Sequence, residues 1–288
     1  MDDGLEIEVG TLARGLSFPE SPRWHDGRLW VSDWGAGQVL AIGHDRQVEV
    51  VARVDAFPLC IDHLPDGRLL VVAGSDHRIL RQEPDGSLVT HADLAPLSEH
   101  PWNDIVADAR GNVYVNNIGF DFPGGEFAPG IVAVVAADGS VRQVAEGLAF
   151  PNGMAITPDE STLIVAESYG NRLTAFEIRP DGDLSPGRPW ANVDGYPDGI
   201  CVDAENAVWY ADVPNKRCTR VREGGEVAQV IELDRGCFAC VLGGDNRRML
   251  FIATNVWSGS ADASGGSGDS AMGQVRAVEV AVPGAGRP

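Results

Sequence analysis

The chain has 288 residues, of which 44% are hydrophobic, and its 42 acidic against 22 basic side chains give a formal charge of -20. This excess of negative charge disfavours nucleic acids and anionic membranes as partners, because their phosphates would be repelled. The first residues lack the basic and apolar parts of a signal peptide, and no apolar run is long enough to span a membrane, so a cytoplasmic protein is expected.

A short apolar phrase recurs six times along the chain and is typical of a β-strand. The copies lie at 29–33, 69–73, 113–117, 163–167, 208–212 and 249–253, at intervals of about 40 to 50 residues, which is the period of a propeller blade. One strand-like segment precedes the first copy and two follow it. The pattern predicts an all-β protein, a six-bladed β-propeller of four-stranded antiparallel blades, with residues 1–288 as a single domain.

Short turns and the two ends of the chain complete this architecture. Asp-Gly pairs mark hairpin turns at Asp26-Gly27, Asp66-Gly67, Asp85-Gly86, Asp138-Gly139 and Asp181-Gly182. The sixth period lacks a fourth strand, so the strand-like residues 5–16 are expected to join that blade and close the ring. The small-residue segment 258–272 is expected to be a mobile loop within the last blade.

The cysteines do not indicate a disulfide framework. Their number is odd and their spacing irregular, which favours reduced thiols packed in the core: Cys60, Cys201, Cys218, Cys237 and Cys240. Cys237 and Cys240 form a C-x2-C pair, but no second pair completes a zinc site. The sequence also lacks a serine nucleophile motif and a glycine-rich nucleotide fingerprint.

One position in each repeat is expected to face the central channel, at the start of the innermost strand. Alignment of the repeats on their turns places six residues there: Glu20, Leu59, Asn103, Asn152, Asp198 and Phe238. Four of them carry side-chain oxygens, which are costly to bury without a partner. A cation is the simplest partner, and oxygen ligands with two carboxylates suit calcium, magnesium or manganese. A plug of hydrogen-bonded side chains and water is the alternative.

Four stretches at these strand starts resemble the signature segments of one family. They are Phe18-Pro19-Glu20-Ser21-Pro22-Arg23-Trp24, Trp102-Asn103-Asp104, Phe150-Pro151-Asn152-Gly153-Met154-Ala155 and Pro197-Asp198-Gly199-Ile200. In them the chain is similar to the senescence-marker-protein, gluconolactonase and luciferin-regenerating enzyme family. The resemblance implies one divalent cation held by Glu20, Asn152 and Asp198, with calcium expected first and magnesium, manganese or zinc as alternatives.

The resemblance also implies an activity, the opening of a lactone ring by water activated at the cation. Asp198 would be the general base, and Asn103 would contact the substrate or a water beside the cation. Pro101 stands where sugar-lactone hydrolases of the family commonly carry an arginine that binds substrate hydroxyls. The resemblance therefore predicts a small-molecule lactone or similar cyclic ester, without predicting a sugar.

The segment 116–127 is expected to form a loop over the channel mouth. Its three phenylalanines favour a less polar substrate. Asp121 of this loop is a candidate substrate-binding residue, and so is His100, which lies three residues before Asn103. Asp33, Glu167 and Asp212, at the ends of second strands, are expected to cap those strands.

Two other functions stay open on the sequence. One is a metal-dependent hydrolase of another electrophile, such as an organophosphate or an epoxide, which a cation in a propeller could also polarise. The other is a non-catalytic calcium-binding propeller, which would bind metal without turnover. Four axial oxygen donors favour an enzyme over a scaffold.

Overall fold

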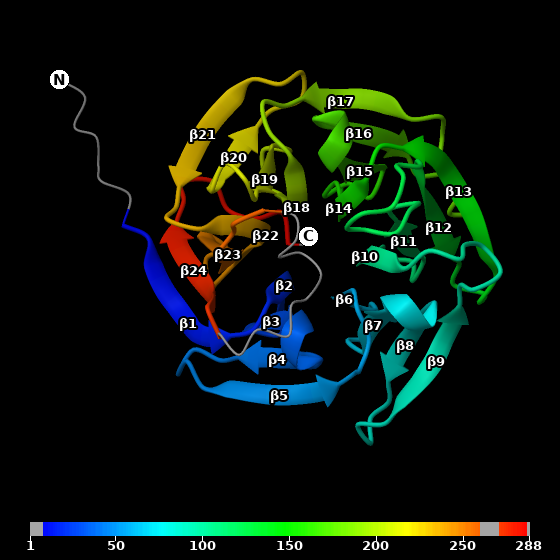
Figure 1. Ribbon diagram of the computed structural model, residues 1–288, viewed down its shortest axis with the longest axis horizontal. Coiled ribbons are helices and arrows are strands. Elements are labelled where there is room, and N and C mark those ends of the chain that lie inside the picture. The colour runs from blue at the N-terminus through cyan, green and yellow to red at the C-terminus, as the bar shows by residue number, and fades with distance from the viewer. Residues whose placement is uncertain (1–7, 260–270, 287–288) are drawn as a thin grey trace.

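In the described part of the chain, residues 8–259 and 271–286, the strands of the computed structural model form six antiparallel sheets of four strands each, arranged in a ring (Figure 1). Innermost strands of neighbouring sheets contact one another around the ring, and the innermost strand of the sixth sheet contacts that of the first. The predicted six-bladed β-propeller is therefore confirmed.

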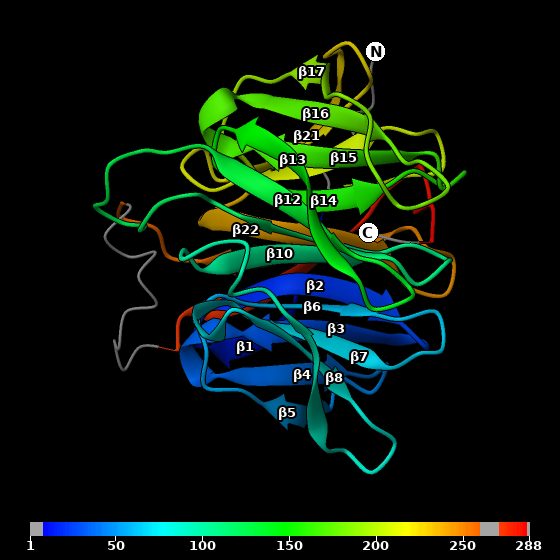
Figure 2. The same cartoon turned by 90° about the vertical axis from the view of Figure 1, so that its right-hand side faces the viewer.

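The innermost strand of each sheet borders the channel. These strands are β2 (Pro19–His25), β6 (Leu59–His63), β10 (Trp102–Ala107), β14 (Pro151–Ile156), β18 (Pro197–Val202) and β22 (Gly236–Gly243), and the sheets are called blades one to six in this order. Figure 2 shows the ring from the side, with the strands running from one of its faces to the other. Residues at the starts of all six innermost strands therefore lie at the same end of the channel.

The six repeated phrases form the second strand of each blade, as expected. These strands are β3 (Arg28–Asp33), β7 (Leu69–Ala73), β11 (Val113–Asn117), β15 (Thr162–Glu167), β19 (Val208–Asp212) and β23 (Met249–Asn255). Neighbouring blades cover them on both faces, and every residue of β7 is buried. Burial on both faces accounts for continuous apolar runs, because neither face has to be polar.

Burial falls from the channel outward. The third strands are β4 (Gln38–Ile42), β8 (Arg78–Gln82), β12 (Gly130–Val135), β16 (Arg172–Glu177), β20 (Arg217–Val221) and β24 (Gly273–Glu279). The outer strands are β5 (Val48–Arg53), β9 (Leu88–Asp93), β13 (Val141–Leu148), β17 (Arg188–Asn192), β21 (Val227–Glu232) and, in blade six, β1 (Gly10–Leu16). In β5 only Ala52 is buried.

The N-terminal strand closes the ring. β1 pairs antiparallel with β24, from Gly10 opposite Ala277 to Leu16 opposite Gly273. Figure 1 shows β1 in blue beside β24 in red, so the two ends of the chain share blade six. This confirms the predicted closure. The loop predicted at 258–272 falls mostly on residues 260–270, which lie outside the described residues.

An Asp-Gly pair forms the hairpin turn between the first two strands of blade one. Asp26 and Gly27 connect β2 to β3, and both have positive φ angles, 48° and 71°. A two-residue hairpin of this type needs a positive φ at both positions, which Asp tolerates and Gly adopts freely. The pair therefore sets the register that places the start of β2 at the channel.

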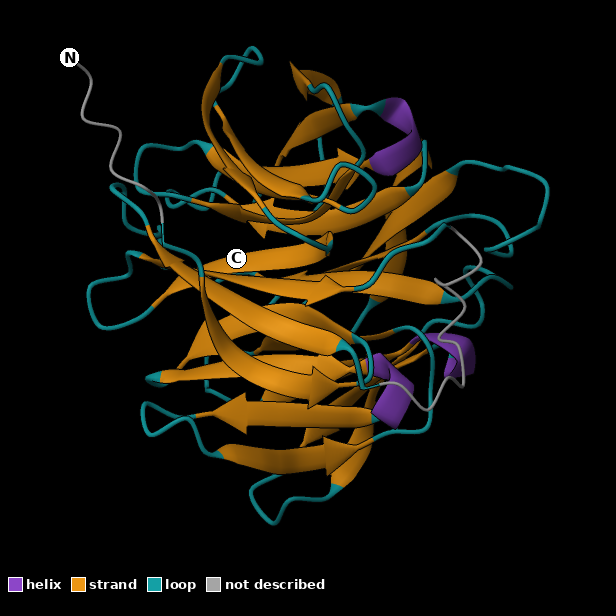
Figure 3. Cartoon of the chain, turned by 60° about the vertical axis from the view of Figure 1, so that its left-hand side comes forward, coloured by secondary structure: helices purple, strands orange, loops and turns teal. Residues whose placement is uncertain are grey.

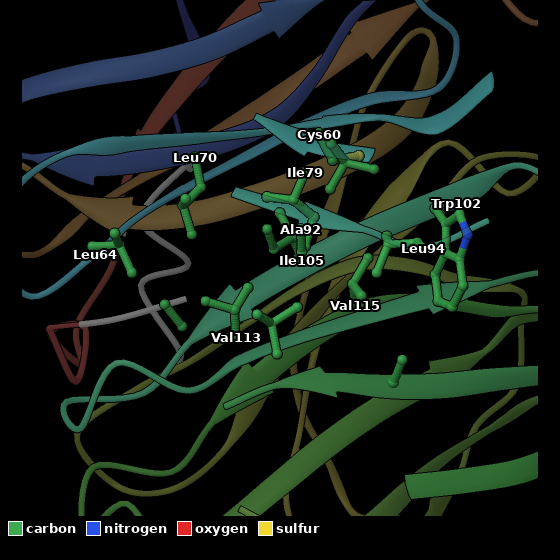
Figure 4. Packing of buried hydrophobic residues seen from close by; sticks show 14 residues of the cluster. Cys60, Leu64, Leu70, Ile79, Ala92, Leu94, Trp102, Ile105, Val113 and Val115 are labelled. Carbon is green, nitrogen blue, oxygen red and sulfur yellow. The ribbon is translucent and has the colours of Figure 1, made fainter. Parts of the chain in front are cut away.

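Apolar side chains of adjacent blades interlock to form the core. In the cluster of Figure 4, Leu70 and Ile79 of blade two pack with Trp102 and Ile105 of blade three, and all four are fully buried. Each blade thus buries a face against its neighbour, and complete burial of such a side chain stabilises the fold by about 1.5–3 kcal/mol. The stability of any blade depends on the ring being closed.

The cysteines are free and buried, as predicted. Four of them, Cys201, Cys218, Cys237 and Cys240, belong to the cluster between blades five and six. The Sγ atoms of Cys201 and Cys240 are 4.0 Å apart, at the distance of a weak thiol hydrogen bond, and do not form a disulfide. They serve as small hydrophobic side chains in the packing between these blades.

Helix in the described residues is confined to three single turns, drawn purple in Figure 3: η1 (Trp34–Ala36), η2 (Gly74–Asp76) and η3 (Ser168–Gly170). Each follows a second strand, and the next residue has a left-handed conformation that leads the chain into the third strand. With three residues each, they are far shorter than a helix that crosses a membrane.

Candidate active site at the channel mouth

Backbone bulges set the axial residues apart from the regular ladder. In β14 the pairing with β15 shifts between Pro151 and Met154, which frees Asn152 and Gly153 from direct partners. Equivalent shifts occur in three more innermost strands, next to Asn103, Asp198 and Glu20. Strand β6 has no polar axial residue, and its pairing with β7 is regular. The pairing of β22 with β23 also shifts, at the apolar axial residue Phe238. Bulges re-aim side chains, and here they occur at the four axial oxygen donors and at Phe238.

Glycine follows two of the donors because adjacent innermost strands approach closely. A Cβ atom on Gly153 would lie 2.5 Å from the backbone oxygen of Asp198, and one on Gly199 would lie 2.4 Å from the Cβ of Ala239. Only glycine avoids these clashes. Gly153 therefore allows β14 to approach β18 beside Asn152, and Gly199 allows β18 to approach β22 beside Asp198.

The structure brings the four axial donors together. A cavity of about 380 Å³ opens at this end of the channel, and its lining includes the carboxylate, amide and hydroxyl groups of Glu20, Asn103, Asn152, Ser168 and Asp198. The amide nitrogen of Asn103 donates to Oδ1 of Asn152 across 3.4 Å, and the amide nitrogen of Asn152 donates to Oγ of Ser168 across 3.4 Å. Ser168, in η3, was not predicted from the sequence. The volume lies in the range of small-molecule sites.

Two other predicted substrate contacts lie elsewhere. His100 and Asp121 are not among the residues that line the cavity, although their neighbours Pro101 and Phe120 are. The Nδ1 atom of His100 lies 3.2 Å from Oδ1 of Asp121, and the carboxylate of Asp121 is largely exposed. In this arrangement the two side chains pair with each other at the surface.

Acidic residues at the ends of second strands hold the turns that lead into the axial positions. The carboxylate of Asp33 accepts hydrogen bonds from the backbone N–H groups of Ser17 and Phe18, at 2.9 and 2.7 Å. Glu167 accepts one from the N–H of Ala149 at 2.7 Å. These acids cap strand ends, as expected, and the turns they hold immediately precede Glu20 and Asn152.

A buried ionic network below the cavity was not predicted from the sequence. The guanidinium of Arg23 donates to Oδ1 of Asp104 at 3.1 Å and to the backbone oxygen of Ile105 at 2.7 Å, and its Nε lies 3.7 Å from Oδ1 of Asp62. Asp104 accepts from the N–H of Met154 at 2.7 Å. The network therefore joins blades one to four directly beneath the axial donors.

Comparison with known proteins identifies the family. Residues 18–256 match the family model of the SMP-30/Gluconolactonase/LRE-like region. The chain belongs to this family. The pentonolactonase XacC of Haloferax volcanii is 27% identical over 93% of this chain and 92% of its own length.

Two solved structures show that this SMP-30/gluconolactonase-like protein shares its fold with known propellers. A luciferin-regenerating enzyme superposes with a TM-score of 0.81 at 21% identity, over 96% of this chain and 97% of that chain. The gluconolactonase XC5397 of Xanthomonas campestris superposes with a TM-score of 0.75 at 24% identity, over 97% and 91% of the two chains.

Burial raises the pKa values of the acids in this SMP-30/gluconolactonase-like site. The pKa of Glu20 rises from 4.5 to about 8, mainly because the carboxyl is removed from water, and the charge of Asp104 adds to the shift. Burial also raises the pKa of Asp198 well above its ordinary value, with further contributions from Glu20 and Asp104. Arg23 opposes the shift of Glu20, but its guanidinium is already paired with Asp104.

A divalent cation fits this donor set. Glu20 and Asp198 would keep their negative charges if a cation offset the cost of their burial. No group of three or more His, Cys, Asp or Glu side chains in the described ranges forms a metal site by itself. The set of ligands would therefore have to include the amide oxygen of Asn152. Carboxylate and amide oxygens are the ligands that calcium prefers.

The raised pKa of Glu20 predicts how stability depends on pH. Between about pH 5 and pH 8 the unfolded chain has lost the Glu20 proton while the folded protein retains it, so the free energy of unfolding of metal-free protein falls as the pH rises. His63 acts in the opposite direction, because burial, followed by the charge of His25, lowers its pKa to about 3. The measurement compares the melting temperatures of the wild type and of Glu20→Gln in chelator. We expect the wild-type value minus the variant value to decrease as the pH rises across this range.

Calcium supplies the control for this prediction. Ligands must be deprotonated to bind a metal, so calcium should raise the melting temperature of the wild type more at about pH 8 than at about pH 5. The Glu20→Gln variant should show a much smaller calcium effect at both pH values. A wild-type-minus-variant difference that increases with pH in chelator would contradict the assignment of a raised pKa to Glu20.

Proposed function

We propose that this protein is a divalent-metal-dependent hydrolase that opens a lactone ring. The observation that carries the proposal is the convergence of Glu20, Asn103, Asn152 and Asp198 on one cavity of about 380 Å³. Polar groups that converge in a concave, mostly apolar pocket are a usual mark of an active site. Membership of the family and the likeness to a protein named pentonolactonase support lactones as the class of substrate.

The cation would be held by Glu20, Asn152 and Asp198, and calcium fits best because every donor is an oxygen. Magnesium and manganese share this preference, whereas zinc usually takes histidine or cysteine ligands. When bound, the cation would polarise the ester carbonyl and stabilise the negative charge that develops on its oxygen.

The side chains of the cavity would supply the remaining chemistry. Asp198 would act as general base and accept a proton from the attacking water. Water adds to the carbonyl carbon, the ring C–O bond breaks, and the released alkoxide takes up a proton to give a hydroxy acid. The amide of Asn103, which already points toward Asn152, would donate a hydrogen bond to an oxygen of the substrate.

A panel of lactones read with a pH indicator tests the proposal, because each ring opening releases a proton near neutral pH. We expect turnover that chelator reduces by at least about a hundredfold and that one of calcium, magnesium, manganese or zinc restores. The same panel includes a phosphate triester and an epoxide. Hydrolysis of these without any lactone would indicate another electrophile as substrate, and calcium binding without any turnover would indicate a non-catalytic propeller.

A further inference from the structure

Carboxylate and amide side chains occupy the floor of the cavity, and its sides are built mainly from aromatic rings, of which Trp34, Tyr169, Tyr196 and Trp257 also carry an indole N–H or a hydroxyl. The floor is formed by the axial donors, at the starts of the innermost strands, and by Ser168 of η3. Toward the mouth the lining comes from loops and from the single-turn helices η1 and η3, and it is aromatic or aliphatic. This separation of a polar end from an apolar body is a constraint on the ligand, because each part of the ligand must match the wall it meets.

One aromatic wall comes from blades three and four. Phe120 and Phe122 lie in the loop between β11 and β12, Phe150 precedes β14, and Tyr169 lies in η3. The ring centroids of Phe122 and Phe150 are 5.0 Å apart and those of Phe150 and Tyr169 are 4.7 Å apart. Rings at these distances support one another, so the wall is a packed surface rather than a set of separate side chains.

A second aromatic wall comes from blades six, one and two. Phe18 contacts Trp34 of η1 with ring centroids 5.6 Å apart, and it contacts Phe238 of β22 at 4.8 Å. Phe57, which precedes β6, packs edge-on against Trp34 at 5.1 Å, and Trp257, which follows β23, packs against Phe238 at 6.0 Å. All five rings line the cavity.

The two walls face each other across the channel. In a ring of six blades the third lies opposite the sixth and the fourth lies opposite the first. The first wall is carried by blades three and four, and the second is centred on blades six and one. The cavity is therefore a slot between two aromatic surfaces, with the axial donors at its base.

The upper part of the cavity disfavours charged and highly hydroxylated substituents. Of the described residues that line the cavity, none is lysine, arginine or histidine, so a phosphate or carboxylate group held between the walls, away from the proposed cation, would have no basic side chain to pair with. Most ring hydroxyls of a sugar would lose hydrogen bonds to water against the aromatic walls, whose polar groups among the described residues are the hydroxyls of two tyrosines and the indole N–H groups of two tryptophans. Pro101, which lines the cavity, donates no hydrogen bond from its side chain.

The size of the cavity admits more than a bare lactone. An apolar cavity of about 150 Å³ accommodates benzene. The cavity here, of about 380 Å³, has room for a lactone ring at the floor together with an aromatic ring between the walls.

We propose that the substrate is an uncharged lactone with an aryl or similarly bulky apolar substituent, bound with its ester at the axial donors and its apolar ring between the two aromatic walls. This inference rests on the proposed lactone hydrolysis and adds to it the class of lactone.

A matched pair of substrates tests this class. γ-Phenyl-γ-butyrolactone and γ-(hydroxymethyl)-γ-butyrolactone share the lactone ring and release a secondary alkoxide, and they differ in whether the substituent is apolar or polar. After correction for their rates with hydroxide, we expect kcat/KM to be at least about fiftyfold higher for the phenyl lactone, since one methylene in an apolar pocket already changes it about 10- to 200-fold. Equal values, or a preference for the hydroxymethyl lactone, would overturn the proposal.

Variants of one wall show whether the walls cause the preference. Phe122→Ala should lower kcat/KM for the phenyl lactone by about tenfold and change it by less than about twofold for the hydroxymethyl lactone. Tyr169→Ser, at a ring that is 48% exposed, should do the same without disturbing the fold. The control is Val227→Ala, on the outer strand β21, 55% exposed and outside the lining, which should leave both values unchanged. An equal loss for both substrates in Phe122→Ala would argue against the slot.

Binding of the corresponding lactams separates this proposal from the proposed function. Lactams keep the ring and the carbonyl but resist hydrolysis, and calorimetry with the phenyl and hydroxymethyl lactams needs no turnover. We expect the phenyl lactam to bind at least about tenfold more tightly. If neither lactone is hydrolysed but this preference holds, the proposed hydrolysis fails and the ligand class stands. If both lactones are hydrolysed without preference and the lactams bind equally, the proposed hydrolysis stands and the proposed class of ligand fails.

Discussion

Replacement of Asp198 by asparagine is expected to lower kcat for lactone hydrolysis by at least about a hundredfold while the protein remains folded. A positioned general base typically contributes about a hundredfold to ten-thousandfold to a rate, and the amide cannot accept the proton. The charge that would hold the cation is reduced as well. Steady-state kinetics of the purified variant, with saturating calcium, measure the effect.

Stability separates this outcome from misfolding. Burial, Glu20 and Asp104 all raise the pKa of Asp198, so the ionised carboxylate is unfavourable in metal-free protein. The nearly isosteric amide removes that charge, and the melting temperature of Asp198→Asn in chelator should equal or exceed that of the wild type. A variant that is inactive because it is unfolded would melt at a lower temperature.

Two more variants complete the comparison. Glu20→Gln should show a loss of the same order, because Glu20 provides the other carboxylate of the site. Asp194→Asn makes the same chemical change as Asp198→Asn at a fully exposed position four residues away, and its kcat should stay within about twofold of the wild type. Unchanged turnover in both Asp198→Asn and Glu20→Gln would remove this cavity from consideration as the active site.

The architecture could be predicted because the second strands repeat the same physical situation six times. Each second strand is buried on both faces, so an apolar phrase recurs once in every blade. The axial donors could be found for the same reason. Once the repeats were aligned, Asn152 and Asp198 stood at equivalent positions, and the structure places both on the cavity.

The ionic network could not be predicted because it depends on contacts between different blades. Arg23, Asp62 and Asp104 lie 39 or more residues from one another in the chain, and their pairing is set by the close approach of β2, β6 and β10. The sequence feature that could have indicated the network is a charged side chain within an otherwise apolar innermost strand. Asp62, between Ile61 and His63, is the clearest case, because a carboxylate there is buried.

Proximity to Asn103 in the sequence does not decide which residues line the cavity. His100 lies three positions before it, but the bulge in β10 lies between Trp102 and Ile105, after His100, and His100 pairs with Asp121 outside the lining. Trp34 and Tyr169, by contrast, line the cavity although they are far from Asn103 in the sequence. They line the cavity from single helical turns that follow second strands, a position for which the repeat pattern predicted no element.

The stability of the folded protein is expected to depend strongly on its first strand, β1. Deletion of residues 1–16 removes β1, and we expect the free energy of unfolding to fall by about 5 kcal/mol or more. Leu16 and Ala13 of β1 pack with Leu29 and Phe251 at the junction of blades six and one. Loss of a buried leucine alone costs about 2–5 kcal/mol, and the deletion also exposes the hydrogen-bonding edge of β24. The total approaches the whole stability of an ordinary domain.

Denaturant unfolding of a shorter truncation provides the control. Deletion of residues 1–8 leaves β1 intact, together with the hydrogen bonds from Arg276 to the backbone oxygens of Val9 and Gly10, and should leave stability within about 0.5 kcal/mol of the full chain. Leu16→Ala should lie between the two truncations, because it opens a cavity but keeps the strand pairing. If the 1–16 deletion unfolds at the same denaturant concentration as the full chain, pairing of β1 with β24 does not hold the ring closed.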